Sequence, residues 1–254
     1  MRSIWDERMA MIDARAITLM RPGSGEVQTG QHGGRPAAKL GEMLADLEGR
    51  AVGILGGRVS SRRLHVMLAH PWYDAVILPW QAGLREGDAW RAYACGLLAE
   101  QDVPDPEAES LCIEDAPYGK ARLCVAVRHA LVQDLQSAAD HTGWRLASCV
   151  DATSASAGRF LRRLGSDCTL VVVEPGTLTS LVRRQNEWQE LTTLRFDFDK
   201  PLDSALVVAD ALSGRPTDLP ALLAGFLPSH INVVEEGHWQ RLGSPGPRWD
   251  EVPI

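Results

Sequence analysis

The sequence of 254 residues lacks the marks of several large protein classes. No apolar run approaches the roughly 20 residues of a membrane-spanning helix, and the charged stretch 1–7 has no apolar core of a signal peptide. Cysteine is scarce, and none of the five cysteines forms a C-x-x-C pair. They are Cys95, Cys112, Cys124, Cys149 and Cys168. Their odd number and apolar surroundings predict reduced, buried thiols in a cytoplasmic protein. The lack of a long apolar run predicts no direct membrane span.

Motifs of the common enzyme classes are missing as well. There is no G-x-S-x-G of a serine hydrolase, no Walker-type phosphate loop and no G-x-G-x-x-G after a strand. His65 and His70, like His230 and His238, lack a companion cysteine or carboxylate at ligand spacing. We therefore expect no metal site and assign no catalytic residue.

The balance of charge makes nucleic acid an unsuitable partner. The formal net charge is -7 and the sequence pI is about 5.5, whereas nucleic-acid binding needs a basic surface. The hydrophobic fraction of 45% and the charged fraction of 23% are typical of a soluble globular protein. The length fits one large domain or two small ones.

The stretch Thr169–Val182 organises the rest of the chain. It begins with an apolar, β-branched run, which is typical of a strand covered on both faces. Glu174, Pro175-Gly176 and small hydroxyl residues follow, and apolar character then returns at Leu181. We expect a buried strand that turns tightly into a second strand. The tip of this hairpin could present backbone N–H groups to a ligand, or it could be plain β-meander architecture.

The remaining chain is expected to contain both strands and helices, with several strands following one another directly. The expected strands are 9–13, 16–20, 26–28, 51–55, 65–69, 74–78, 111–114, 121–127, 144–150, 188–196, 205–209 and 231–234. The expected helices are 37–47, 86–101, 128–142, 154–164 and 219–226. Consecutive strands predict a mixed sheet. A strand, a polar turn and an antiparallel partner occur twice, from Met9 and from Leu170, which indicates a weak internal duplication.

This duplicated hairpin plan, with an acid ending the first strand of each half, resembles that of the actin-like ATPases. Ile12-Asp13-Ala14-Arg15-Ala16-Ile17 stands where their first phosphate loop would be, and Val173-Glu174-Pro175-Gly176-Thr177 where the second would be. The stretch from residue 72 to 196 also resembles the cytoplasmic platform proteins of type II secretion and type IV pili, GspL and PilM. That likeness runs through Ile77-Leu78-Pro79-Trp80, Trp90-Arg91-Ala92-Tyr93, Ala130-Leu131-Val132-Gln133-Asp134-Leu135, Gly143-Trp144-Arg145-Leu146 and Glu187-Trp188-Gln189.

The resemblance implies an α/β protein with a duplicated actin-like (ribonuclease-H-like) fold, mixed sheets and flanking helices. Its first subdomain would span residues 1–142 and its second residues 143–243, and residues 244–254 would form a flexible tail. In the relatives, the two hairpin tips hold nucleotide phosphates between the subdomains. The resemblance therefore makes Asp13, Glu174, Gly176 and Thr177 the candidate cofactor-binding residues, for ATP with magnesium.

These positions depart from the pattern of nucleotide-binding members. The first turn, Ala14-Arg15, is short and has no glycine, and Pro175 has no N–H to donate in the second. The turn Ser213–Pro216 is a poor match to the glycine pair that lies against adenosine. Asp13 and Glu174 could hold magnesium through water, or they could be strand-end acids that face solvent or an arginine.

We expect from this resemblance a non-catalytic cytoplasmic scaffold of a type IV pilus or type II secretion platform. It would bind a cytoplasmic peptide of an inner-membrane partner, an assembly ATPase, or both, and would lie at the membrane only through that partner. No cofactor is then needed. The alternative is a nucleotide-binding ATPase or sugar-kinase-like enzyme of the same fold, and a third interpretation is an unrelated α/β protein.

Tryptophan is the unusual residue, with eight against three Tyr and four Phe. Trp90 and Trp144 fit core positions, whereas Trp72, Trp80, Trp188 and Trp239 stand at strand ends or turns. Rings at such places either meet a partner or cover seams within the chain.

Overall fold

The computed structural model describes residues 6–51, 62–196, 202–212, 219–226 and 239–245. The chain forms two compact units, the first from residues 1–72 and 128–151 and the second from residues 73–127 and 152–254. Each unit therefore combines segments that are distant in the sequence. The subdomain boundary expected after residue 142 stays a prediction.

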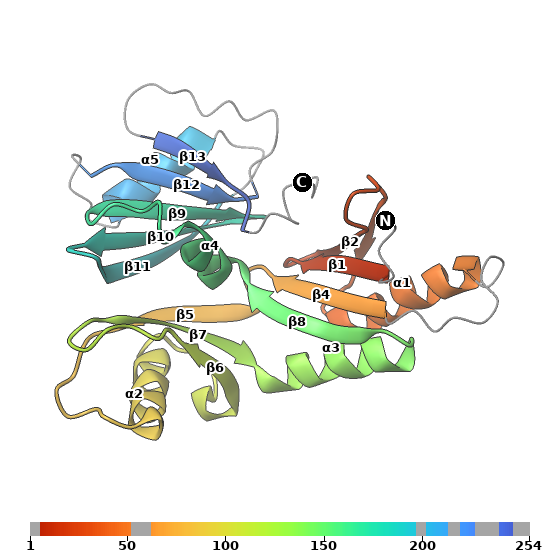
Figure 1. Ribbon diagram of the computed structural model, residues 1–254, viewed down its shortest axis with the longest axis horizontal. Helices are drawn as coiled ribbons and strands as arrows, with labels where there is room; N and C mark the ends of the chain where they lie inside the picture. The colour runs from red at the N-terminus through yellow and green to blue at the C-terminus, as the bar shows by residue number, and fades with distance from the viewer. Residues whose placement is uncertain (1–5, 52–61, 197–201, 213–218, 227–238, 246–254) are drawn as a thin grey trace. The chain divides into compact units, whose positions relative to one another are not determined.

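Unit 1 is built on a five-stranded mixed sheet in the order β3-β2-β1-β4-β8 (Figure 1). The expected hairpin is confirmed, because β1 pairs antiparallel with β2 and β2 with β3. On its other edge β1 pairs parallel with β4, and β4 pairs parallel with β8. The strands are β1 (Asp6–Ile12), β2 (Ala16–Met20), β3 (Val27–Gln31), β4 (Arg62–Leu68) and β8 (Arg145–Asp151).

Unit 2 contains a sheet with the same plan, in the order β11-β10-β9-β12-β13. Here β9 pairs antiparallel with β10 and β10 with β11, while β12 runs parallel to β9 and to β13. The strands are β9 (Cys168–Glu174), β10 (Thr177–Arg184), β11 (Glu187–Arg195), β12 (Ala221–Gly225) and β13 (Trp239–Gly243). Strand order and direction thus repeat between the units, which confirms the duplication at the level of topology.

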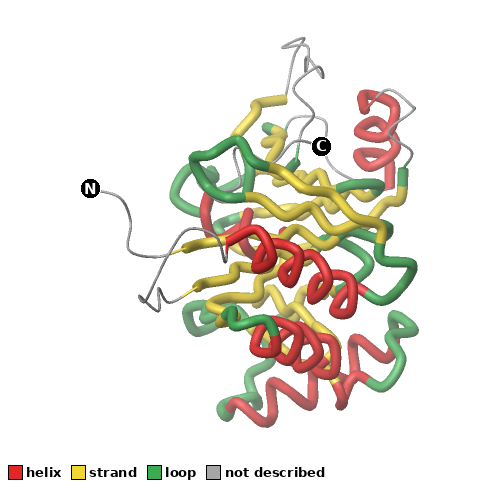
Figure 2. The backbone as a smooth tube through the Cα atoms, turned by 90° about the vertical axis from the view of Figure 1, so that its right-hand side faces the viewer, coloured by secondary structure: helices red, strands yellow, loops and turns green. Residues whose placement is uncertain are grey.

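Two helices cover the sheet of unit 1. Helices α1 (Pro36–Ala51) and α3 (His129–His141) lie side by side in both views and contact β2 and β8, respectively (Figures 1 and 2). Leu40 and Leu44 on α1 are fully buried four residues apart, which is one helical turn. On α3, Leu131, Leu135 and Ala139 are buried at helical spacing. Helix α1 extends beyond the expected range 37–47 at its C-terminal end.

In unit 2 two predictions near the C-terminus are wrong: a helix forms where a strand was expected, and a strand forms where a helix was expected. The expected strand 205–209 lies in helix α5 (Leu202–Leu212), and the expected helix 219–226 contains strand β12. Leu206 and Ala209 of α5 pack on the buried face of β9 and β10, whereas Val207 is 68% exposed. All five residues of β12 are buried, because the strand lies between β9 and β13. A short apolar run shows too little periodicity to separate a helix from a fully buried strand.

A smaller sheet in the order β5-β7-β6 completes unit 2. Helix α2 packs on it through Trp90, Ala94 and Leu98, which recur at helical spacing. The expected core position of Trp90 is therefore confirmed. The elements are β5 (Tyr73–Leu78), α2 (Gly87–Glu100), the short 3-10 helix η1 (Pro106–Ala108), β6 (Glu109–Ile113) and β7 (Arg122–Arg128).

Helix α4 (Ala152–Phe160) contacts β9 and β12. It is also hydrogen-bonded to Ser244, near the end of the last described segment. Arg159 Nη1 donates hydrogen bonds to the backbone oxygen of Ser244 at 2.7 Å and to its Oγ at 3.2 Å. Ser244, the first residue of the expected tail, is buried. Residues 52–55 and 231–234 of two expected strands, Ser213–Pro216 and residues 246–254 lie outside the described residues.

The close approach of β12 to β9 requires a glycine. Gly225 has φ +102° and pairs with Val173, and a Cβ at this position would lie 2.2 Å from the Val173 carbonyl oxygen. Both the backbone conformation and the lack of space exclude a side chain.

We expect Gly225→Ala to lower the free energy of unfolding by about 3 kcal/mol or more, because β9 must move away from β12 to admit the methyl group. Urea denaturation measures this. Gly96→Ala is the matched control, since Gly96 lies in α2 and a Cβ added there would have no neighbouring atom within 4 Å. That change should be neutral or stabilising by up to about 1 kcal/mol. Equal effects of the two substitutions would contradict the close approach.

The cysteines are free thiols of unequal burial. Cys124 and Cys168 are buried and Cys112 is exposed, so the expectation of buried thiols is correct only in part. Burial raises the pKa of Cys124 to about 12, with smaller contributions from the neighbouring Cys112 and Cys95. Burial, followed by the charge of Asp151, raises the pKa of Cys149 to about 11. Burial also raises the pKa of Cys168.

These raised pKa values predict a loss of stability in alkali. Above pH 9.0, the ordinary value of a thiol, the unfolded chain loses protons that the folded chain keeps, so stability falls as the pH rises toward 12. Each such thiol contributes at most about 1.4 kcal/mol per pH unit. Urea midpoints between about pH 8 and about pH 10.5 should fall less steeply for Cys124→Ala than for the control Cys112→Ala. Parallel curves for both variants would refute this assignment.

Candidate functional site

The first candidate tip, between β1 and β2, is closed by its own acid. Asp13 Oδ1 accepts hydrogen bonds from the backbone N–H groups of Arg15 and Ala16, both at 2.7 Å. The Asp13 N–H in turn donates to the Ala16 carbonyl at 3.0 Å. Aspartate is favoured at such turns because its short side chain reaches the amides two and three residues ahead. Two amides of this tip are thus directed at a carboxylate of the chain itself.

The backbone carbonyl of Asp13 is a second anchor of this turn. It accepts hydrogen bonds from Trp72 Nε1 at 2.6 Å and from His32 Nε2 at 3.0 Å. His32 Nδ1 accepts from the Gly34 N–H at 3.1 Å, so the ring proton is on Nε2. The two rings meet edge to face with centroids 5.4 Å apart. Trp72 therefore has an internal role that fixes the first tip.

The second candidate tip, between β9 and β10, is a two-residue turn. Pro175 and Gly176 are its central residues, Gly176 has φ +78°, and Glu174 pairs with Thr177 across it. Proline followed by a residue of positive φ is the signature of a type II turn. The Gly176 carbonyl accepts from the Phe196 N–H at 3.1 Å. Because Pro175 has no N–H, the turn offers one donor fewer to a phosphate than a glycine-rich loop would.

Glu174 is fully buried and belongs to a chain of polar side chains from three elements. The Tyr73 hydroxyl on β5 donates a hydrogen bond to Glu174 Oε1. The same hydroxyl oxygen lies 2.7 Å from Thr153 Oγ1 on α4. Since the phenol has one proton and gives it to Glu174, Thr153 is the donor of the second bond. The interpretation of Glu174 as an acid that faces solvent is therefore wrong.

The candidate residues divide between the two units. Asp13 belongs to unit 1, whereas Glu174, Gly176 and Thr177 follow one another around the second tip in unit 2. Thr177 is buried beside Glu174. The described residues contain no group of three or more His, Cys, Asp or Glu side chains that could hold a metal ion. Each tip is thus held by internal hydrogen bonds, and binding of ATP with magnesium at these residues stays a prediction.

Trp188, one of the tryptophans expected at a strand end or turn, is internal and lies beside Arg183. Arg183 Nη1 donates to the carbonyls of Leu164 and Gly165 at 3.3 and 3.0 Å. Its guanidinium carbon lies 5.7 Å from the centre of the Trp188 ring, and both side chains are buried. They join the α4–β9 connection to β10 and β11, so neither is available to a partner.

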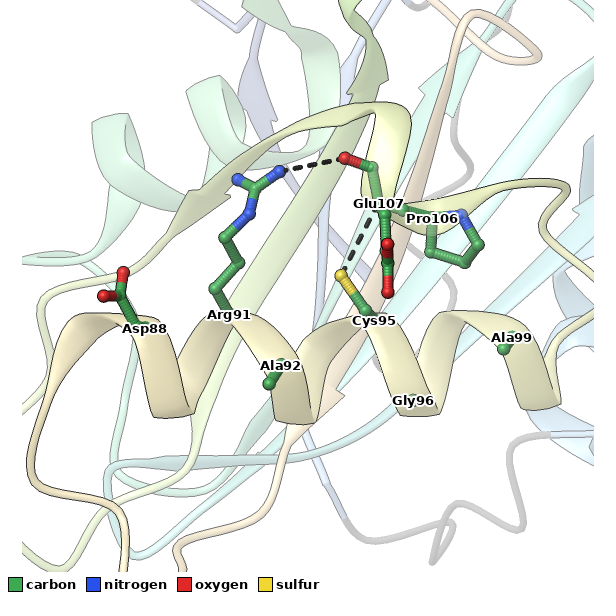
Figure 3. A pocket seen from close by; sticks show the side chains of 8 residues that line it. All are labelled: Asp88, Arg91, Ala92, Cys95, Gly96, Ala99, Pro106 and Glu107. Atoms are coloured by element: carbon green, nitrogen blue, oxygen red, sulfur yellow. Dashed lines mark hydrogen bonds between the residues drawn. The ribbon is translucent and has the colours of Figure 1, made fainter.

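A hollow of about 640 Å³ lies beside α2 and η1 in unit 2 (Figure 3). Small residues form the helix side of it, and Arg91 and Cys95 reach across to the other side. Arg91 Nη2 donates to the carbonyls of Glu107 and Glu109, and Cys95 Sγ donates to the Pro106 carbonyl at 3.6 Å. These side chains hold η1 against α2, and the Cys95 thiol is bonded to a backbone carbonyl.

Sequence reasoning missed the residues that fix the two tips, namely Tyr73, Thr153 and His32. Tyr73 is separated from Glu174 by 101 residues and from Thr153 by 80. No local pattern predicts such contacts. The neighbouring pair Trp72-Tyr73 at the start of β5 was the available signal, because amphipathic rings at strand ends often have a hydrogen-bond partner.

The sequence matches no protein-family model and no curated protein. Solved structures do resemble it. The cytoplasmic domain of EpsL, an inner-membrane component of the type II secretion system of Vibrio cholerae, is 15% identical, covers 97% of this chain and 92% of its own, and gives a TM-score of 0.58. A chain of the PilM–PilN type IV pilus biogenesis complex is also 15% identical, covers 98% and 90%, and gives a TM-score of 0.53.

These similarities extend over nearly the whole chain and confirm the predicted fold class. The protein has an actin-like, mixed α/β fold of the kind seen in the EpsL cytoplasmic domain and the PilM–PilN complex. At 15% identity the likeness concerns the fold. Among the described helices, none is long and apolar enough to cross a membrane.

The buried polar chain predicts coupled effects on stability. Tyr73→Phe should cost about 1–3 kcal/mol, because Glu174 and Thr153 each lose a partner in the interior. Thr153→Val should cost less in the Tyr73→Phe background than in the natural chain, by at least about 0.5 kcal/mol. Thermal and urea unfolding of the four proteins give this double-mutant cycle.

Tyr93→Phe is the matched control for this cycle. Its hydroxyl accepts one exposed hydrogen bond, from Gln81 Nε2 at 3.3 Å, so its loss should change stability by less than about 0.5 kcal/mol. Additive effects of Tyr73→Phe and Thr153→Val would show that their hydroxyls are not coupled.

Proposed function

We propose that this chain is a non-catalytic scaffold of a type IV pilus or type II secretion assembly platform. It binds a short cytoplasmic segment of an inner-membrane partner and lies at the membrane through that partner. Support comes from the fold, which resembles the cytoplasmic domain of one inner-membrane component and a chain of the PilM–PilN complex over at least nine-tenths of each. An assembly ATPase is a second partner in this proposal.

The non-catalytic part of the proposal rests on the hydrogen bonds within the first hairpin tip. Phosphate binding needs several backbone N–H groups that point outward and converge on the anion. Here the amides of Arg15 and Ala16 are bonded to Asp13 Oδ1. To bind a phosphate, the turn would have to give up both bonds and bring an anion to a carboxylate, which repels it.

The second tip supports the same proposal. Magnesium binds through exposed carboxylate oxygens and ordered water. Glu174 is 0% exposed and one of its oxygens accepts the Tyr73 hydroxyl. Releasing that oxygen to a metal ion would break the buried Tyr73–Glu174 hydrogen bond, which costs about 1–3 kcal/mol. The hydrogen bonds of both tips therefore act against the binding of ATP with magnesium.

Thermal unfolding in the presence of millimolar ATP and magnesium tests the non-catalytic part. We expect no rise in the midpoint. A nucleotide at 100 times its dissociation constant would add about 2.7 kcal/mol, which is a clear shift for a chain of this size. A nucleotide-binding actin-like ATPase, measured in the same buffer, serves as the positive control. A rise that disappears in Glu174→Gln would identify the chain as a nucleotide-binding protein instead.

Co-purification from the native cell tests the platform part. A tagged chain is expected to recover an inner-membrane component of a pilus or secretion system, with or without its assembly ATPase. The untagged strain is the control for proteins that bind the resin. Recovery of no pilus or secretion component would contradict the scaffold proposal and leave the fold unaffected.

A further inference from the structure

A second hollow in unit 2, of about 340 Å³, combines aromatic rings with positive charge. It lies where the end of β5, the start of α2 and the β6–β7 connection come together. The residues that line it are Trp80, Leu84, Arg85, Trp90, Pro117, Tyr118, Gly119, Lys120 and Arg122. We refer to it as the Trp80 pocket. It shares no residue with the two hairpin tips.

The rings of the Trp80 pocket form a continuous aromatic surface. Trp80 stacks on Trp90 with centroids 6.3 Å apart and an interplanar angle of 20°. Tyr118 meets Trp80 edge to face at 4.7 Å. On the other side, the guanidinium carbon of Arg122 lies 4.9 Å from the centre of the Trp90 ring. The buried Trp90 supports the half-exposed Trp80, so the outer rings are held in place from behind.

Tyr118 is 87% exposed although it is held in a tight turn. The Lys120 N–H donates to the Pro117 carbonyl at 3.2 Å, and Gly119, with φ +83°, supplies the left-handed residue of the turn. A larger residue than glycine would be strained here. An ordered, exposed tyrosine costs little entropy to immobilise and is typical of the centre of a binding surface.

Among the described residues, Trp80 Nε1 donates no hydrogen bond. The indole N–H of Trp80 is therefore available to an acceptor. A backbone carbonyl of a bound peptide, placed across the ring edge, would supply one.

The charge of the pocket is positive in an otherwise acidic protein. Three cations and no acid line it, whereas the whole chain carries a formal charge of -7. Arg122 donates to the carbonyls of Glu114 and Ala116, and Lys120 Nζ lies 3.5 Å from Glu187. Arg85, by contrast, is exposed and forms no ion pair with any described residue. It is the cation that remains open to a ligand.

We infer that the Trp80 pocket binds an extended, proline-containing segment of a partner protein that carries acidic side chains. Such a segment in the polyproline II form has flat proline rings that pack on aromatic side chains, and its carbonyls are not used internally. A proline would pack against the outer surface of the Trp80–Tyr118 pair, with Trp80 Nε1 donating to a carbonyl. Arg85 would pair with an acid next to that proline. This inference does not rest on the scaffold role, because it is drawn from the pocket alone.

Fluorescence anisotropy with three labelled synthetic peptides tests the inference on the full chain. The first repeats Pro-Pro-Glu, the second Pro-Pro-Lys and the third Gly-Ser-Glu. We expect saturable binding of Pro-Pro-Glu that is about tenfold tighter than that of either other peptide, since one loses the charge match and the other the stiff backbone and the proline rings. No saturable binding of Pro-Pro-Glu, or equal binding of Gly-Ser-Glu, would overturn the inference.

Two exposed substitutions locate the binding to the pocket. Tyr118→Ala should weaken Pro-Pro-Glu binding by about tenfold, and Arg85→Glu should weaken it and favour Pro-Pro-Lys. The matched controls are Leu212→Ala for an exposed apolar side chain and Arg15→Glu for the charge change, both of which should leave binding within about twofold. Binding that is unaffected by both pocket variants would place the peptide elsewhere and refute the site. The outcomes of the nucleotide and co-purification experiments do not change how these peptide results are interpreted.

Discussion

Each unit is built around one central buried strand, and the need to pair this strand along both edges determines the strand order of its five-stranded sheet. All seven residues of β9 are buried, so each of its peptide N–H and C=O groups must find a partner in a neighbouring strand. The antiparallel β10 serves one edge and the parallel β12 the other, with Gly225 allowing the close approach. In unit 1, β1 is paired in the same way by β2 and β4. An antiparallel neighbour in the sequence needs a tight turn, which is why a hairpin tip follows the central strand in both units.

Asp13 and Glu174 occupy equivalent places at the two hairpin tips but differ in burial. In both cases the carboxylate accepts hydrogen bonds from the chain itself. Asp13 lies one residue beyond β1 and is partly exposed, so its carboxylate can bend back to the amides of its own turn. Glu174 is the last residue of β9 and fully buried, and a buried acid requires a hydrogen-bond donor. Tyr73 supplies it from β5 and ties the small sheet to the large one within unit 2. The same bonds that stabilise the hairpins therefore direct donors and acceptors away from a ligand.

Local signals in the sequence predicted the hairpins and most helices, and failed where long-range packing decides. Pro175-Gly176 and the residues around it specify a turn by their own backbone preferences, so that hairpin was predictable. Leu222 and Leu223 have helical propensity, yet they form a strand because β9 and β13 enclose them. Asp13 and Glu174 were found from their position after a strand. Their partners were not, because His32, Trp72, Tyr73 and Thr153 come close only through tertiary contacts.

Some aromatic side chains are buried or hydrogen-bonded within the fold, whereas others remain exposed. Trp90, Trp144 and Trp188 are buried, and Trp72 is bonded to the Asp13 carbonyl. Trp80 remains half-exposed with Tyr118 against it, on the side of the small sheet where positive charge gathers. Burial of these two rings would stabilise the chain, but the turn at Gly119 keeps Tyr118 outside. If the Trp80 pocket binds a proline-containing segment as we infer, that partner would cover the Tyr118 ring that the fold leaves in water.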